Sequence, residues 1–195
     1  RDPNSAGDAA YMLAKGQGKA RADRNGHGKA AQRWRLLFLS AGEESLSALM
    51  ERGGKKISAG QEIRLAEIEA DAGAGMGLFE NLCGHAGAAI LAAVLGKATR
   101  MAYGAVGREW LKHLVADRGS IASTLVERIR ELSAELTPSD AHGQVVRVAR
   151  RFALVAIAGE LATDYGLTGW PDGEAVKGAK ACFRSWLEDF GDAGS

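Results

Sequence analysis

Residues 21–43 read RADRNGHGKAAQRWRLLFLSAGE, and this stretch decides which fold we expect. Its first half is basic and small around Asn25-Gly26, a pair that favours a hairpin turn because both residues tolerate positive φ. Its second half closes on the apolar run Leu36 to Leu39, which has no polar face and is typical of a strand covered on both sides. We therefore predict a basic hairpin that leads into a buried strand ending at Ser40.

The flanking segments extend this α/β pattern. Residues 4–16 (NSAGDAAYMLAKG) predict a helix that Asn4 or Ser5 caps and Gly16 ends. Residues 43–56 (EESLSALMERGGKK) predict a second helix, which stops at Gly53-Gly54. Residues 61–69 (QEIRLAEIE) alternate apolar and polar residues and predict a second strand, so that the two strands and the helix between them would form one right-handed βαβ unit.

From about residue 86 the pattern becomes entirely helical. Helices are predicted over residues 86–103, 106–117, 121–136, 143–165 and 173–190, with turn-rich breaks at 137–143 and 166–174. Trp110, Trp170 and Trp186 are expected to pack in the helical core. The predicted fold class is therefore α+β and mostly helical, with an α/β domain over residues 1–85 and a helical domain over residues 86–195.

Composition limits the classes of function. The 195 residues are 46% hydrophobic and 25% charged, as in an ordinary globular protein, and the net charge is only +1. Nucleic-acid binding would therefore have to rest on local clusters of charge. Two cysteines form no disulfide framework, which favours a reducing cytoplasm. No apolar run reaches about 18 residues, so no membrane span is expected.

Such a cluster lies between Lys15 and Arg35, where seven basic residues accompany one acid, Asp23. The cations are Lys15, Lys19, Arg21, Arg24, Lys29, Arg33 and Arg35. Cationic donors in a glycine-rich loop suit phosphate contacts, and we take Lys19, Arg21, Arg24, His27, Lys29 and Arg33 as the DNA-binding candidates. No aromatic residue lies at the tip, so base stacking is not predicted there. A solvated loop without a ligand is the alternative.

Two residues outside this cluster are candidates for chemistry. Ser40 would lie at the carboxyl end of the buried strand, the edge where open α/β sheets bind ligands. Its alternative role is to cap the following helix. Arg64 is a cation within an apolar strand and needs an anionic partner. In an oligomeric ATPase it could reach the γ-phosphate of a neighbouring subunit, and an internal salt bridge or a solvated strand edge is the alternative.

Other motifs argue against further sites. Gly73, Gly75 and Gly77 follow a G-x-G-x-G spacing without the Lys-Ser/Thr of a P-loop, so we expect only an unusual connection between strand and helix. Cys83 and His85 have no second pair at zinc spacing, and no metal site is predicted. No cofactor is therefore expected within this chain.

Long stretches of the chain resemble a known family. These are AYMLAKGQGKARADRNG (10–26), RWRLLFLSAGEESL (33–46), GQEIRLAEIEADAGAGMGLFE (60–80), RVARRFALVAIAGELAT (147–163) and GLTGW (166–170). Together they resemble the carboxyl-terminal half of a helicase-like ATPase family of phages and plasmids. The family is known as domain of unknown function 927, and its members are often labelled superfamily II helicase and inactivated derivatives.

The resemblance implies a fold and a function. It makes residues 1–85 the distal part of a RecA/AAA-like core whose P-loop and Mg²⁺-binding strand lie upstream, so we expect the chain to be a fragment. ATP and Mg²⁺ are implied for the longer parent protein, and hydrolysis by these residues alone is not expected. Ser40 would match the sensor position and Arg64 the arginine finger, while the tip over residues 25–29 would contact DNA, expected to be single-stranded, in a central channel.

Two rival interpretations stay open. One is a non-catalytic DNA-binding or regulatory module derived from such an ATPase. The other is a helical oligomerisation domain without a role in nucleic-acid binding. Homo-oligomerisation of the chain is left open in the ATPase interpretation as well.

Overall fold

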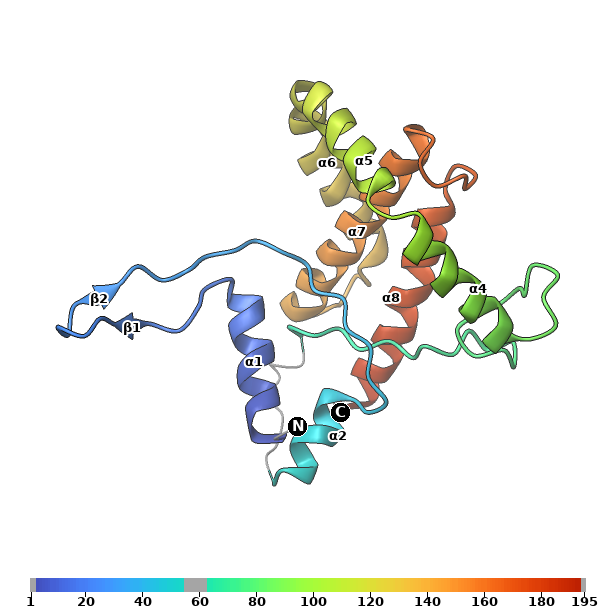
Figure 1. Ribbon diagram of the computed structural model, residues 1–195. Helices are drawn as coiled ribbons and strands as arrows, with labels where there is room; N and C mark the ends of the chain where they lie inside the picture. Colours follow the sequence, from blue (N-terminus) through green and yellow to red (C-terminus); the bar gives the residue numbers. More distant parts are fainter. Residues whose placement is uncertain (1–2, 55–62, 194–195) are drawn as a thin grey trace. The chain divides into compact units, whose positions relative to one another are not determined.

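The chain divides into two compact units in a computed structural model that describes residues 3–54 and 63–193 (Figure 1). The amino-terminal unit comprises Arg1–Glu67 and the helical unit comprises Ile68–Ser195. The units divide at residue 67, whereas the continuous succession of helices begins at Ala88.

The amino-terminal unit begins with α1 (Pro3–Lys15), which confirms the first predicted helix. Proline suits the first turn because the amide hydrogen that it lacks has no intrahelical acceptor there. A capping residue must precede the first turn, but Asn4 and Ser5 lie inside it. The prediction that one of them caps this helix is therefore wrong. Gly16 follows the helix with φ of 69°, the left-handed conformation that commonly ends a helix.

The second predicted helix is also present, as α2 (Leu46–Arg52). The Ser45 hydroxyl accepts a hydrogen bond from the Ala48 amide at 3.0 Å, and Gly53 follows the last turn as predicted. Leu46 and Met50, one turn apart, are the buried residues of this helix. Ser45, not Ser40, therefore caps α2.

The predicted buried strand over residues 36–39 is wrong. These residues are extended but exposed, from 45% for Phe38 to 102% for Leu39. A strand covered on both faces needs neighbouring strands and covering layers. In the described part of the chain, the only strands are the two-residue strands β1 (Arg21–Ala22) and β2 (Gly28–Lys29), which pair only with each other. No sheet receives the run, so Ser40 ends no strand and is exposed.

The second predicted strand is also absent over its described part. Gln61 and Glu62 lie outside the described residues, and residues 63–69 form a turn followed by irregular backbone. Ile63 is buried, and the carboxylate of Glu67 accepts a hydrogen bond from the Leu46 amide at the start of α2. These local contacts replace strand pairing, so the predicted βαβ unit does not form.

The helical unit confirms all five helices predicted beyond residue 86, with boundaries within a few residues. They are α4 (Ala88–Met101), α5 (Ala105–Ala116), α6 (Arg118–Leu136), α7 (Gly143–Asp164) and α8 (Glu174–Ala193). The mostly helical α+β class is therefore confirmed, with β1 and β2 as its small antiparallel sheet.

The core of the helical unit lies between α6, α7 and α8. Leu132 of α6 and Ala153, Ala156 and Ile157 of α7 form a buried cluster. Partly buried residues of α6 and α8 pack against it: Leu125, Ile129, Leu136, Val176 and Ala179. Repeats of three and four residues keep these side chains on one face of each helix, so burying that face holds the three helices together.

Aromatic residues extend the core between α7 and α8. Phe183 is almost fully buried and meets Phe152 edge-on, with 5.5 Å between the ring centroids. Trp186 is 3% exposed and stacks on Phe190 at 4.9 Å. The prediction of a core role is therefore confirmed for Trp186, whereas it is wrong for Trp170, which lies in the loop before α8 and is 51% exposed.

A smaller aromatic cluster attaches α5 to the end of α7. Tyr165, just beyond α7, stacks on His113 with 4.3 Å between the ring centroids. Trp110 lies 5.9 Å from the same tyrosine ring and is half-buried.

Among the described residues no single helix is long and apolar enough to cross a membrane. The pair of α4 and α5, bent by 63° at its break, meets the length and composition of a span only when both helices are counted together.

Candidate nucleic-acid interface

The predicted basic hairpin is present, and its tip is a three-residue loop. The Asp23 amide donates to the His27 carbonyl at 2.8 Å, and the Gly26 amide donates to the Asp23 carbonyl at 3.2 Å. Gly26 has φ of 81°, the left-handed conformation that closes such loops. The predicted turn is thus one residue longer than the Asn25-Gly26 pair, and of these two residues only Gly26 adopts positive φ.

Asp23, the one acid of the basic segment, is engaged in closing this loop. One carboxylate oxygen accepts hydrogen bonds from the Asn25 amide at 2.8 Å and the His27 amide at 2.9 Å. The other carboxylate oxygen lies 3.5 Å from the imidazole of His27. Both carboxylate oxygens of Asp23 are therefore engaged within the tip of the hairpin.

The hairpin keeps one register from its tip to its root. Arg21 pairs with Lys29 and Ala22 with Gly28, and the isolated bridge between Gln17 and Arg33 continues the same register. Side chains alternate between the two faces of a paired ribbon. This alternation assigns the cations of the arms to one face, together with Gln17, Asp23 and Ala31, whereas the other face has small residues and Gln32. The cationic face carries Lys19, Arg21, Lys29 and Arg33, and the small face carries Gly18, Ala20, Ala22, Gly28 and Ala30.

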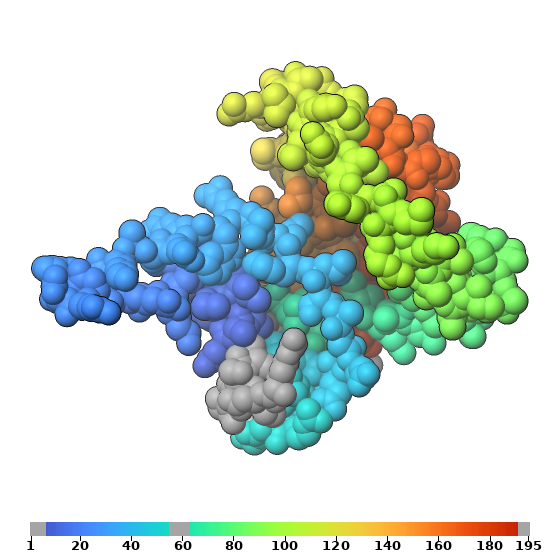
Figure 2. Space-filling model, in the orientation of Figure 1, coloured from blue at the N-terminus to red at the C-terminus, as the bar shows by residue number. Residues whose placement is uncertain are grey.

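The cations of this segment are available to a ligand. All seven basic side chains between Lys15 and Arg35 are exposed, as is His27. None of the seven forms an ion pair within residues 3–54 and 63–193. The hairpin extends beyond α1 as a thin projection (Figure 2). A projecting ribbon with one basic face can lie along a polyanion without first breaking internal salt bridges.

The root of the hairpin is joined to the end of α1 by Trp34. Its backbone amide donates to the Gly16 carbonyl at 2.9 Å, and its indole nitrogen donates to the Leu13 carbonyl at 3.0 Å. A Cβ atom on Gly16 would lie 2.5 Å from the Trp34 carbonyl oxygen, so this approach requires glycine. The end of α1 and the returning arm therefore form one hydrogen-bonded base for the hairpin.

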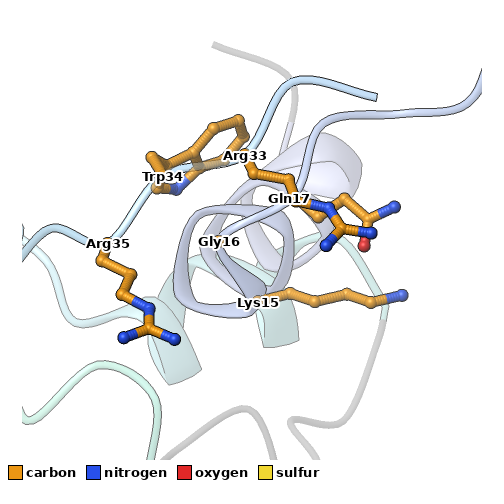
Figure 3. Close-up of a pocket in the computed structure, with 6 residues that line it drawn as sticks. All are labelled: Lys15, Gly16, Gln17, Arg33, Trp34 and Arg35. Atoms are coloured by element: carbon orange, nitrogen blue, oxygen red, sulfur yellow. The ribbon is translucent and has the colours of Figure 1, made fainter. Parts of the chain in front are cut away.

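A hollow of about 500 Å³ opens at this root (Figure 3). Its lining residues are Lys15, Gly16, Gln17, Arg33, Trp34 and Arg35. Arg33 is among the DNA-binding candidates that the sequence indicates, whereas Trp34 is not. The hairpin register was the available signal, because counting outward from the Asn25 turn brings Trp34 opposite Gly16.

The structure does not place Ser40 or Arg64 within the hairpin hollow. Ser40 is exposed on irregular backbone, without the strand end that suggested a nucleotide contact. The guanidinium carbon of Arg64 lies 4.3 Å from the centroid of the Tyr11 ring, an attractive cation–π arrangement within the amino-terminal unit. The sensor and arginine-finger roles of these residues stay predictions.

The glycine-rich segment after residue 70 forms an unusual connection, as expected, although no strand precedes it. Gly73, Gly75 and Gly77 all have positive φ, between 62° and 77°. The Ala72 amide donates to the Gly77 carbonyl at 2.9 Å and closes the turn. In the part of the chain that the structure describes, no three His, Cys, Asp or Glu side chains are grouped so as to hold a metal ion.

Comparisons of the chain with protein-family models, with curated proteins and with solved structures find no match. Among the described residues, the basic hairpin is the structural feature that bears most directly on function.

Proposed function

We propose that this chain is the nucleic-acid-binding part of a helicase-like ATPase of phage and plasmid type. In this proposal the basic hairpin binds the phosphodiester backbone of single-stranded DNA. The amino-terminal unit would correspond to the distal part of a RecA/AAA-like core, and ATP and Mg²⁺ would bind to the parent protein outside these residues. The resemblance of the sequence to that family supplies the catalytic half of the proposal.

The observation that carries the DNA-binding half is the one-sided charge of the hairpin. Four cations share a face of the paired arms, and Arg24 adds a fifth at the tip. Phosphate contacts made by such side chains release condensed counterions, and they supply affinity without reading the base sequence. The small residues on the opposite face keep the ribbon thin, which suits entry into a narrow channel.

Salt dependence gives the proposal a quantitative form. Each phosphate neutralised on a single strand contributes about −0.7 to the slope of log K against log salt concentration. We expect the Arg24→Ala/Lys29→Ala variant to make that slope about 1.4 less steep, and to weaken binding to all oligonucleotide sequences alike. Fluorescence anisotropy with a labelled dT12 oligonucleotide, over a series of salt concentrations, measures both quantities.

The control removes the same two residue types from another exposed surface. Lys97→Ala/Arg100→Ala changes one lysine and one arginine on α4, both of them exposed. If hairpin charge is responsible, this control keeps the slope of the unmodified chain. An equal loss of DNA affinity in both variants would mean that binding depends on the net charge of the chain and not on the hairpin. Absence of binding at low salt would refute DNA binding by this chain.

A separate experiment addresses the ATPase half of the proposal. In the full-length parent protein, Arg64→Ala is expected to abolish DNA-stimulated ATP hydrolysis if Arg64 is an arginine finger. Tyr11→Leu removes the aromatic partner of Arg64 but leaves the guanidinium in place. Loss of hydrolysis in Arg64→Ala alone supports the finger, whereas equal loss in both variants indicates that their contact is structural.

One observation favours a helical oligomerisation domain as the second candidate function. Large apolar residues of α4 and α5 are exposed, among them Met101 at 77%, Val106 at 60% and Val115 at 75%. Exposed apolar side chains concentrated on neighbouring helices mark a surface that another molecule can cover. Sedimentation velocity over a concentration series tests this candidate, and a monomer at all concentrations would contradict self-association.

A further inference from the structure

We propose that the hollow at the hairpin root is a second nucleic-acid subsite, which holds one nucleotide of a single strand. Its phosphate would lie among Lys15, Gln17 and Arg33, and its base would stack on the indole of Trp34. This inference rests on the proposed function, because it assigns a further contact to the same DNA strand. It differs in chemistry from the tip, which has no aromatic side chain.

The charge of the hollow favours a phosphate. Three of its six lining residues are cations, and none is acidic. The backbone carbonyl oxygens at the carboxyl end of α1 carry partial negative charge and would repel an anion. Two of these carbonyls, those of Leu13 and Gly16, already accept hydrogen bonds from Trp34. The side chains of Lys15, Gln17 and Arg33 extend to one side of Gly16 in Figure 3, where their donors can converge on one anionic group.

The same hollow contains a fixed aromatic surface. Trp34 is half-buried, and the hydrogen bond from its indole nitrogen to the Leu13 carbonyl holds the ring in one orientation. A ring held in place loses little side-chain entropy when a base stacks on it. Stacking on an aromatic side chain tolerates every base, which matches a protein that moves along DNA.

Spacing allows one strand to contact root and tip together. Gly18 and Asn25 are seven positions apart in the sequence, which corresponds to about 23 Å of extended chain. At about 3.4 Å per stacked nucleotide, this distance corresponds to about seven nucleotides. A 12-nucleotide strand is therefore long enough to make both contacts.

A matched pair of variants separates stacking from folding. Trp34→Phe and Trp34→Leu both lose the hydrogen bond to Leu13, but only Trp34→Phe keeps an aromatic ring. Anisotropy is measured in the full chain with dT12 and with an abasic 12-mer that has the same phosphates and no bases. We expect Trp34→Leu to weaken dT12 binding about fivefold or more, to leave abasic binding unchanged, and Trp34→Phe to stay within about twofold of the unmodified chain on dT12.

The outcomes distinguish this inference from the proposed function. If Arg24→Ala/Lys29→Ala weakens dT12 binding while Trp34→Leu does not, DNA binding by the hairpin stands and the root subsite is refuted. Equal weakening of dT12 and abasic binding by Trp34→Leu also refutes stacking. If the unmodified chain binds neither oligonucleotide, both proposals fall. Free ATP that displaces dT12 from the unmodified chain but not from Trp34→Leu would assign the hollow to a free nucleotide and overturn its assignment to a strand.

Discussion

Gly159 sets how closely α7 and α8 approach each other. A Cβ atom at this position would lie 2.5 Å from the Cβ atom of Ala175. Alanine normally favours a helix over glycine by up to about 1 kcal/mol, whereas overpacking a core costs about 1–3 kcal/mol. We expect Gly159→Ala to lower the free energy of unfolding by about 1–2 kcal/mol, measured by urea denaturation, because the steric cost exceeds the gain in helix propensity.

Two further variants test this explanation. Gly178 of α8 has open space where its Cβ atom would lie, so Gly178→Ala is expected to stabilise the protein by about 0.5–1 kcal/mol. Ala175→Gly removes the methyl group that a new Cβ atom at position 159 would meet. In combination with Gly159→Ala it should cost less than the sum of the two single changes. Strict additivity would mean that the two side chains do not clash.

Glu160 stabilises the start of α8 from the neighbouring helix. Gly173 precedes α8 and has no side chain to cap it. The Glu160 carboxylate instead accepts hydrogen bonds from the amides of Gly173 at 2.8 Å and Val176 at 2.9 Å. Burial raises the pKa of Glu160, but these amides, that of Ala175 and the charge of Arg128 outweigh it and lower the pKa below its ordinary value of 4.5.

This lowered pKa makes the helical unit sensitive to acid. Because the folded state holds the carboxylate ionised, its stabilisation is complete above the unfolded pKa, near 4.5, and is lost as the pH falls through the lower folded pKa. We expect Glu160→Ala to cost about 1–2 kcal/mol at pH 7, as loss of a helix cap does. Glu160→Gln keeps an acceptor oxygen, so urea denaturation should show a flatter loss of stability below pH 4.5. An unchanged pH profile in Glu160→Gln would contradict this assignment.

Contacts of single residues are predictable from sequence only where they are local. Gly16 and Gly53 end helices where the sequence predicts it, because a helix end depends on its own few residues. The cap of α2 by Ser45 could also have been predicted from the sequence, because a serine that immediately precedes the apolar residues of a helix is a local capping signal. The contact of Glu160 with Gly173 spans 13 residues, and no short-range pattern announces it.

At the scale of elements, the helices were predicted correctly from the sequence, whereas the two predicted strands over residues 36–39 and 61–69 were not. A helix satisfies its hydrogen bonds internally, so its apolar period is sufficient to predict it. A strand needs partners, and the apolar run at Leu36 to Leu39 has none in the described residues. The hairpin is the exception because its partner strand lies only a few residues away, across a turn that the sequence marks. The position of the basic residues on a hairpin was therefore predictable, whereas their binding to DNA stays a prediction.

The exposure of this run gives a direct test of its conformation. Leu37 is 55% exposed, so Leu37→Ala should change the free energy of unfolding by less than about 0.5 kcal/mol. The control is Leu46→Ala in α2 of the same unit, where the leucine is 7% exposed and its loss should cost about 2–5 kcal/mol. Urea denaturation followed by circular dichroism measures both. A comparable loss for Leu37→Ala would show that the run is buried in solution.

At the scale of the whole molecule, the distribution of buried residues separates the two units. Buried apolar residues of the amino-terminal unit are few in the described part, namely Leu46, Met50 and Ile63. The helical unit contains the larger buried cluster, and every member of that cluster lies beyond residue 117. A core built from one continuous stretch of chain does not require the other unit to fold.

We therefore expect residues 86–195 to fold without the rest of the chain. Thermal unfolding followed by circular dichroism should show one cooperative transition, within about 5 °C of the helical transition of the full chain, since a shift of this size corresponds to about 1 kcal/mol. Gly159→Ala should lower both transitions equally, because the contact with Ala175 lies wholly within the helical unit. A broad, non-cooperative transition in the isolated segment would instead mean that the α6–α8 core depends on residues before 86, and the domain boundary predicted there would be wrong.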